Sequence, residues 1–236
     1  MDSATKPLPP RDRFSPIEFV VVIGIAFGDS IFYSIVDVVT GNTLGMRPRN
    51  TALGEADTYA LVIIELALLP ILAAVLYLGG WRWKDFRLGA NRWTTALGIA
   101  LFTGVWLMDW AAVWAMKAMF PALYYAIEAW WSYQPDHPPG LLPILLVATV
   151  NPVFEEFFAG AYVIKSLRRR FGLTAAVWTS AVIRTTYHLY QGLTAAPLHF
   201  AQGLIHGFVY VRYGRLWPLI LAHALSNFLA DAFYLI

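Results

Sequence analysis

The chain has 236 residues, of which 58% are hydrophobic and 14% are charged, and its formal net charge is +2. Soluble domains carry about 25% charged residues, so this composition excludes an ordinary soluble domain. The apolar runs are continuous over roughly 20 residues, which favours an all-α, polytopic membrane bundle over a β-barrel. The small net charge does not indicate nucleic-acid binding, and the absence of cysteine excludes disulfides, thiolate nucleophiles and cysteine metal ligands.

Seven apolar segments are predicted to cross the membrane, and an interfacial helix is predicted between the third and the fourth. The crossing segments have the approximate ranges 17–39, 58–78, 94–120, 141–172, 173–190, 193–213 and 216–236. The interfacial helix is expected in the stretch YYAIEAWWSY, whose aromatic rings suit the headgroup region. The first segment could alternatively be broken at Gly28 and Asp29.

The division into parts follows from polarity. Residues 1–16 are polar and proline-rich, and we expect a cytoplasmic tail there without a cleaved leader. Residues 17–236 are expected to form a single transmembrane helical domain. With the N-terminus in the cytoplasm, thirteen Lys and Arg residues lie on the inner side, three on the outer side, and one, Arg184, inside the membrane. This bias supports a multi-pass protein with a cytoplasmic N-terminus.

Polar residues inside the apolar segments are the strongest functional signal. Glu155 and Glu156 are adjacent in the fourth segment, and carboxylates in hydrocarbon need a function or a compensating partner. The later segments supply the candidate partners Arg184, His188, His223 and Asn227. At a rise of 1.5 Å per residue, Glu155, the two histidines and the asparagine lie roughly 10 to 22 Å from the basic helix ends. They can therefore meet near the middle of the membrane, in a cavity that we expect to open toward the cytoplasmic half.

Three motifs between Asn151 and Leu229 resemble a known family. They are NPVFEEFFAGAY, RTTYHLYQG and FAQGLIHGFVYVRYGRLWPLILAHALSNF. In type and order they resemble those of the CPBP intramembrane proteases, which include type II CAAX prenyl proteases and bacteriocin-processing enzymes. The resemblance implies a glutamate-type endopeptidase without a metal or another cofactor, with its protease core at about 141–236.

The resemblance also implies roles for four residues. Glu155 would be the base that activates water, and His188 would help to hold that water. His223 and Asn227 would stabilise the oxyanion of the tetrahedral intermediate. Peptide hydrolysis needs such a base and such hydrogen-bond donors.

Two positions depart from the family pattern. The family's first motif is E-E-x-x-x-R, and Gly160 stands where the arginine is expected. The second motif is F-x-x-x-H, and Arg184 replaces the phenylalanine. We hypothesise that Arg184 supplies the missing guanidinium, pairs with Glu156 and offsets one buried charge.

Structural alternatives exist for each candidate. The glutamates could form a purely structural ion pair with Arg184, the histidines could be packed in the core, and Asn227 could anchor two helices. Other intramembrane acids (Asp29, Glu65, Asp109 and Asp231) are expected to form interhelical hydrogen bonds or to line a water cavity, and His199 and His206 to pack or line a pore. Two His and one or two Glu could also ligate zinc, but an H-E-x-x-H motif is absent.

The sequence therefore predicts an intramembrane endopeptidase of the bacterial inner membrane. Its expected partners are membrane lipids and a membrane-associated peptide or protein substrate. One rival function is a catalytically inactive membrane scaffold that binds a partner. The other is a small transporter whose carboxylates relay protons or bind cations.

Overall fold

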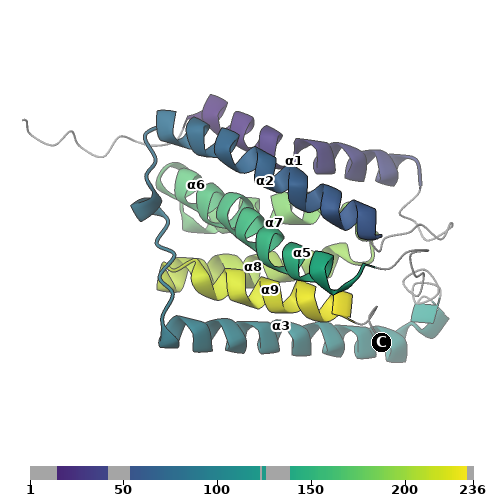
Figure 1. Ribbon diagram of the computed structural model, residues 1–236. Coiled ribbons are helices and arrows are strands. Elements are labelled where there is room, and N and C mark those ends of the chain that lie inside the picture. The colour runs from purple at the N-terminus through teal and green to yellow at the C-terminus, as the bar shows by residue number, and fades with distance from the viewer. Residues whose placement is uncertain (1–14, 42–53, 123, 126–138, 233–236) are drawn as a thin grey trace, which may run out of the picture.

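The computed structural model describes residues 15–41, 54–122, 124–125 and 139–232 of the chain, and their regular structure is helical (Figure 1). The main helices are α1 (Pro16–Val39), α2 (Glu55–Leu78), α3 (Arg92–Met119), α5 (Leu141–Glu155), α6 (Val163–Phe171), α7 (Leu173–Tyr187), α8 (Ala196–Tyr213) and α9 (Trp217–Ala232). Shorter helical turns are η1 (Trp83–Asp85), η2 (Glu156–Tyr162) and η3 (Leu189–Gln191). The predicted all-α membrane bundle is confirmed.

Each predicted crossing segment corresponds to helical structure. Within the described residues, four helical stretches are long and apolar enough to cross a membrane, namely α1, α2, α3 and the continuous stretch Leu141–Phe171. The helices α7, α8 and α9 are shorter, with 15, 18 and 16 residues. Helix α1 runs unbroken through Gly28 and Asp29, so the alternative of a broken first segment is wrong. Most of the predicted interfacial helix lies outside the described residues.

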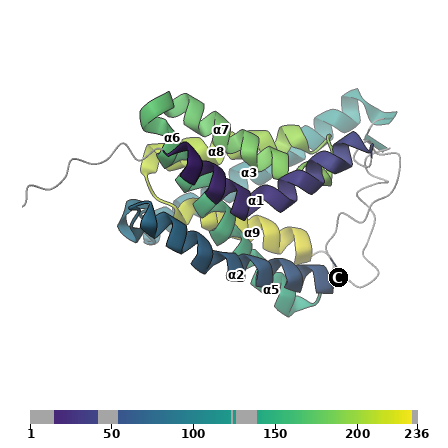
Figure 2. The same cartoon turned by 90° about the horizontal axis from the view of Figure 1, so that it is seen from above.

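The stretch from α5 to α6 occupies the middle of the bundle (Figures 1 and 2). Helix α5 packs against α2 on one side and against α9 on the other, and α3 packs on the far side of α9. Helix α6 packs against α7, which also contacts α8 and α1. Most of the central stretch is buried, whereas most of α1, α2 and α3 is not. The two adjacent glutamates therefore lie inside protein and not against acyl chains.

A π-helical segment, η2, joins α5 to α6 directly after Glu155. All seven of its residues are buried. A π-turn shifts the backbone hydrogen bonds from the α-helical pattern, and in a membrane each carbonyl group that loses its α-helical partner needs another one. The hydroxyl of Ser180 on α7 donates to the carbonyl oxygen of Ala159 at 2.6 Å. Helix α7 thus helps to stabilise the irregular turn that follows the first glutamate.

Close packing of α7 on α8 depends on two glycines. A Cβ atom on Gly203 would lie 2.9 Å from the Cα of Ala181. A Cβ on Gly207 would lie 2.8 Å from Val177 Cγ1. These distances are shorter than real Cβ contacts, so α7 occupies the space that larger residues would need. The two glycines therefore give α8 a small-residue face against α7.

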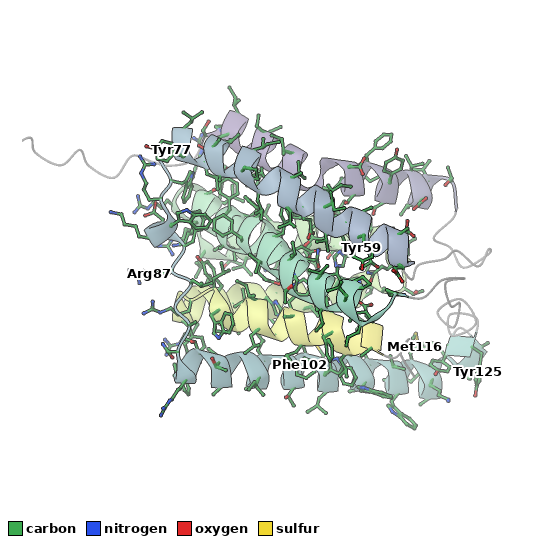
Figure 3. All side chains as sticks on the ribbon, in the orientation of Figure 1. Tyr59, Tyr77, Arg87, Phe102, Met116 and Tyr125 are labelled. Atoms are coloured by element: carbon green, nitrogen blue, oxygen red, sulfur yellow. The ribbon has the colours of Figure 1, made fainter. Side chains whose placement is uncertain are left out.

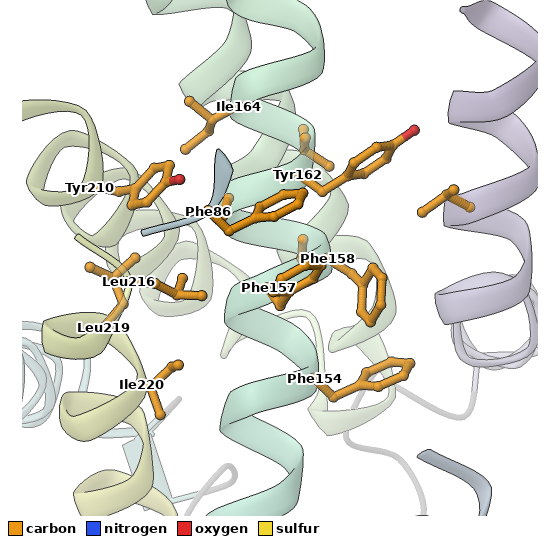
Figure 4. Packing of buried hydrophobic residues seen from close by; sticks show 14 of the residues in the cluster. Phe86, Phe154, Phe157, Phe158, Tyr162, Ile164, Tyr210, Leu216, Leu219 and Ile220 are labelled. Atoms are coloured by element: carbon orange, nitrogen blue, oxygen red, sulfur yellow. The ribbon is translucent and has the colours of Figure 1, made fainter. Parts of the chain in front are cut away.

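Aromatic side chains fill the core on one face of the central stretch (Figure 4). Phe154 and Phe158 lie with ring centroids 5.0 Å apart, and Phe157 contacts Phe86 at 4.2 Å. Phe27 of α1 meets Phe154 edge to face at 5.8 Å. This packing holds α1 and the connector after α2 against the segment that carries both glutamates.

One end of the bundle carries most of the basic side chains, and we refer to it as the basic end. Its basic residues are Arg82, Lys84, Arg87, Arg92, Lys165, Arg168, Arg169, Arg170, Arg212 and Arg215. Helices α2, α6 and α8 finish at this end, while α3, α7 and α9 start there. Figure 3 shows Tyr77 and Arg87 at this end and Tyr59 and Met116 toward the opposite one.

Candidate active site

Glu155 is held by three neighbouring side chains. Its Oε1 accepts a hydrogen bond of 2.9 Å from Asn151 Nδ2, one helical turn earlier. Its Oε2 accepts one of 2.7 Å from the Tyr187 hydroxyl and lies 3.6 Å from Nη1 of Arg184. The residue is buried but still lines a cavity. Both carboxylate oxygens are thereby fixed in place beside a space that a substrate could occupy.

Glu156 is fully buried and points into a cluster of cationic and imidazole groups. Its Oε1 accepts from Arg184 Nη2 at 2.7 Å and lies 3.0 Å from Nδ1 of His223 and 3.1 Å from Nδ1 of His206. The ion pair hypothesised between Arg184 and Glu156 is therefore present. Its Oε2 has no hydrogen-bond partner among the described residues. A Cβ on Gly160 would lie 3.3 Å from this oxygen, so the glycine leaves space for the carboxylate.

The candidate residues converge on one cavity of about 400 Å³, which we call the polar cavity. Glu155, His188, His223 and Asn227 all line it, so the predicted convergence is present. The other polar residues that line it are Asp29, Ser30, Glu65, Asn151, Tyr187, Tyr190, Gln191 and Asp231. Glu156 and Arg184 lie behind this wall. The two adjacent glutamates thus differ in position: Glu155 faces the cavity, and Glu156 packs behind its wall.

The bond to Glu156 determines what His223 can offer to the cavity. An ionised carboxylate only accepts hydrogen bonds, so Nδ1 of His223 must be the donor at 3.0 Å. In the neutral ring the other nitrogen, Nε2, is then an acceptor, and in the protonated ring it is a donor. Stabilising an oxyanion requires a donor, so the predicted role of His223 requires the protonated ring.

A chain of amide hydrogen bonds connects Asn227 to Glu155. Asn227 Nδ2 donates to Asn151 Oδ1 at 3.0 Å. Asn151 Nδ2 in turn donates to Glu155 Oε1 at 2.9 Å and to Glu65 Oε1 at 2.7 Å. One hydrogen of the Asn227 amide is used in this chain. The amide has a second hydrogen, and Asn227 lines the polar cavity.

His188 lies just beyond the end of α7, on the wall of the polar cavity. Its ring packs edge to face against His199, with centroids 4.4 Å apart, and against Tyr187 at 4.6 Å. His199 Nε2 lies 2.7 Å from Oε1 of Gln191. Nδ1 of His188 is buried and has no hydrogen-bond partner among the described residues. The ring is therefore held by packing and shares the cavity with Glu155 without bonding to it.

Helix α1 positions the tyrosine that binds Glu155. The ring of Phe27 stacks on Tyr187 at 4.6 Å with an interplanar angle of 5°. The Ser34 hydroxyl donates to the Tyr187 carbonyl at 3.2 Å and accepts from the Tyr190 amide at 3.3 Å. These contacts fix the end of α7, and with it the tyrosine hydroxyl.

The polar cavity lies in the half of the bundle away from the basic end. On the central stretch its lining residues run from Val147 to Glu155, which is the half of Leu141–Phe171 that precedes η2. On α9 they run from His223 to Asp231, toward the end of that helix that lies away from the basic end. We expected a cavity that opens toward the cytoplasmic half, and the structure shows that its lining lies away from the basic end. Helix α7 starts at the basic end, and His188 follows its last residue, so this histidine lies in the opposite half.

Sequence reasoning missed part of the site. Asn151 precedes Glu155 by four residues, and this spacing on a helix was an available signal for a shared face. Tyr187 follows Arg184 by three residues, which is also a neighbouring position on one helix face. His206 was assigned to packing or pore lining, yet it contacts Glu156. Nothing in a single sequence places α8 beside that glutamate, so this contact required the fold.

The comparison with protein families agrees with this site. Residues 137–229 match the family described as type II CAAX prenyl endopeptidase Rce1-like. The chain carries an Rce1-like domain. This match confirms the resemblance that the three motifs indicated. No curated protein and no solved structure matches the chain.

The Rce1-like domain contains all six site residues that the sequence predicted, namely Glu155, Glu156, Arg184, His188, His223 and Asn227. At family level the domain is that of a CAAX-type intramembrane protease. Two further side chains of the site come from outside it: Glu65 on α2 bonds to Asn151, and Phe27 on α1 stacks on Tyr187. The first two helices thus complete a cavity whose other lining residues, apart from Ala230 and Asp231, belong to the Rce1-like domain.

A metal site was the other chemical interpretation of the two histidines and the glutamates. Among the residues that the structure describes, no three His, Asp or Glu side chains are grouped so that they could hold a metal ion. Glu156 Oε1 is instead surrounded by Arg184 and two imidazole nitrogens, and a guanidinium would repel a cation. The metal-free mechanism stays a prediction.

Proposed function

We propose that this protein is an intramembrane endopeptidase in which Glu155 activates the attacking water. The observation that carries the proposal is the polar cavity, which brings together Glu155 from α5, His188 from the end of α7, and His223 and Asn227 from α9. A base and donors for a developing negative charge are the groups that peptide hydrolysis requires.

The proposed reaction follows from the positions of these groups. Glu155 removes a proton from water, and the oxygen attacks the carbonyl carbon of the scissile peptide bond. The resulting oxyanion accepts hydrogen bonds from protonated His223 and from the amide of Asn227. The C–N bond then breaks, and Glu155 passes its proton to the leaving amine. His188 forms part of the cavity wall where the water and the substrate carbonyl are held.

Glu156 and Arg184 act by positioning and charge balance in this proposal. Glu156 orients His223 through the hydrogen bond from its Nδ1. Arg184 lies 2.7 Å from Glu156 and 3.6 Å from Glu155, so one guanidinium compensates both carboxylates. Removing one oxyanion donor typically costs about 10²- to 10³-fold in rate, and we expect a loss of that order for Asn227→Ala.

The position of the polar cavity restricts the substrate. The peptide bond must reach the half of the membrane opposite the basic end. We infer from the positive-inside rule that this half is the outer one. We propose a multi-pass protein of a bacterial inner membrane, with its N-terminus in the cytoplasm. Its substrate would be a membrane-associated peptide or protein that enters the outer half of the bilayer.

The test compares the membrane proteomes of cells that make the wild type, Glu155→Gln or His223→Ala. A matched control is Asp109→Asn, because this carboxylate accepts a hydrogen bond of 2.8 Å from Gln202 and lies outside the polar cavity. We expect cleavage products, identified by their new N-termini, to disappear with Glu155→Gln and His223→Ala but to persist with Asp109→Asn. Products that persist with Glu155→Gln would contradict the proposal.

One observation favours transport as a second candidate function. Four carboxylates line the polar cavity, those of Asp29, Glu65, Glu155 and Asp231. Intramembrane carboxylates in a water-filled cavity can relay protons or bind cations. A transporter would show pH-linked flux in proteoliposomes that His223→Ala need not abolish. A non-catalytic scaffold would instead keep its phenotype with both Glu155→Gln and His223→Ala.

A further inference from the structure

The connector between α2 and α3 separates two cavities at the basic end. It begins after Leu78 and contains Trp81, η1 and Phe86. Trp81 is buried, donates from Nε1 to Glu18 at 2.8 Å, and stacks on Phe86 at 5.4 Å. The same indole lines a charged pocket on one side and an apolar groove on the other. The two cavities are therefore adjacent and share an aromatic wall.

The first cavity, which we call the basic pocket, has a volume of about 340 Å³. Its charged residues are Lys84, Asp85, Arg87, Lys165, Arg168 and Arg169. Five of these six side chains are cationic, so the pocket has an excess of positive charge. Ser166 belongs to the lining but is only 3% exposed. The excess of cations suits a phosphate group.

The second cavity, which we call the apolar groove, has a volume of about 750 Å³. One wall is the last part of α2, from Leu69 to Tyr77, and the opposite wall is formed by Val153, Phe157 and Phe158. Apart from Arg82, its lining residues carry no charge. The Arg82 guanidinium lies over the Tyr77 ring at 4.4 Å and donates to the Tyr77 carbonyl at 3.2 Å. The cation thus lies at the end of α2, and the rest of the groove is hydrophobic.

We propose that these two cavities form one binding site for an anionic glycerophospholipid. Its phosphate would occupy the basic pocket, and one acyl chain would lie in the apolar groove. Trp81 would lie at the boundary between them, where an indole ring suits the interface between headgroups and hydrocarbon. The bound lipid would connect α2 and the connector to the last turns of α6, at the end of the bundle opposite the polar cavity.

The combination of the two cavities identifies a lipid among other anions. A free phosphate or an acidic peptide would use the basic pocket but would leave the apolar groove unfilled. A zwitterionic lipid would fill the groove, but its choline group would face five cations. Each Lys or Arg near the membrane surface adds about 1 kcal/mol to the attraction of anionic lipid. An anionic headgroup joined to an acyl chain therefore matches both parts of the site.

Native mass spectrometry of the purified full-length protein in mixed micelles tests the proposal. The probes are phosphatidylglycerol and phosphatidylcholine with identical acyl chains, and inorganic phosphate as a competitor. We expect preferential retention of phosphatidylglycerol by the wild type. Lys84→Gln and Arg168→Gln should each weaken its binding about fivefold. The matched control Arg212→Gln removes a charge at the same end but outside the basic pocket, and should leave binding unchanged.

A second pair of variants tests the apolar groove. Ala74→Phe fills the groove and should reduce the retention of both lipids, whereas Ala67→Phe, on an exposed part of α2 outside it, should not. Equal retention of the two lipids by the wild type would overturn the proposed headgroup selectivity. Unchanged retention in Ala74→Phe, or complete displacement of lipid by inorganic phosphate alone, would show an anion site without an acyl chain. Either result would refute the proposal.

Discussion

Removing Arg184 should destabilise the protein more than removing its ionic partner. Glu156 is 0% exposed, and its shortest contact is the 2.7 Å bond from Arg184. In Arg184→Met this carboxylate would remain buried beside two imidazoles without a permanent cation. Breaking a buried ion pair from one side costs about 3–5 kcal/mol, so we expect a loss of that size in the free energy of unfolding.

The reverse change is expected to cost less because the guanidinium keeps a second carboxylate. In Glu156→Gln, Arg184 Nη1 still lies 3.6 Å from Oε2 of Glu155. The substitution weakens only the charge-assisted hydrogen bonds to residue 156, so the unfolding free energy should fall by about 1–3 kcal/mol. The double variant Arg184→Met/Glu156→Gln should lose about 2–3 kcal/mol less unfolding free energy than the two single losses add up to.

Reversible unfolding of the purified protein in mixed micelles, followed by circular dichroism at increasing SDS, measures these differences. The matched control is Arg212→Met, which removes an exposed arginine from α8 and should change the unfolding free energy by less than about 0.5 kcal/mol. If Arg184→Met is no more destabilising than this control, the ion pair does not stabilise the fold. Additive single effects in the double variant would equally refute the coupling.

Three further predictions follow from the same geometry. If Arg184 replaces the family arginine, Gly160→Arg should restore stability to the Arg184→Phe variant but should not stabilise the wild type. Equal effects of Gly160→Arg in the variant and in the wild type would contradict this replacement. Gly203→Ala should destabilise by about 1–3 kcal/mol because its Cβ would meet the backbone of α7. Gly104→Ala, which has open space around it, should be neutral or stabilise by up to about 1 kcal/mol in the same unfolding measurement. Tyr187→Phe removes a hydrogen bond of 2.7 Å to the candidate catalytic carboxylate, so cleavage in the proteome comparison should fall while helical content stays unchanged.

The sequence by itself determined the class of the protein and most of its helices. Continuous apolar runs predict membrane helices because hydrocarbon accepts few charges, and the structure has a helix for every predicted segment. The order of the three motifs indicated the family, which the match to residues 137–229 supports. Spacing of four residues placed His223 and Asn227 on one helix face, and both line the polar cavity.

The family resemblance assigned the role of the base to Glu155, but only the tertiary structure shows why this glutamate, and not its neighbour, faces the cavity. Consecutive residues on a helix point about 100° apart, and of these two only Glu155 lines the cavity. The choice depends on how η2 is packed against α1, α7 and α8. The contact of His206 with Glu156, and the placement of the cavity away from the basic end, depend on the same packing. A sequence pattern gives the face and depth of each side chain along its own helix, whereas neighbours across helices are set by the rotation and offset at which the helices pack.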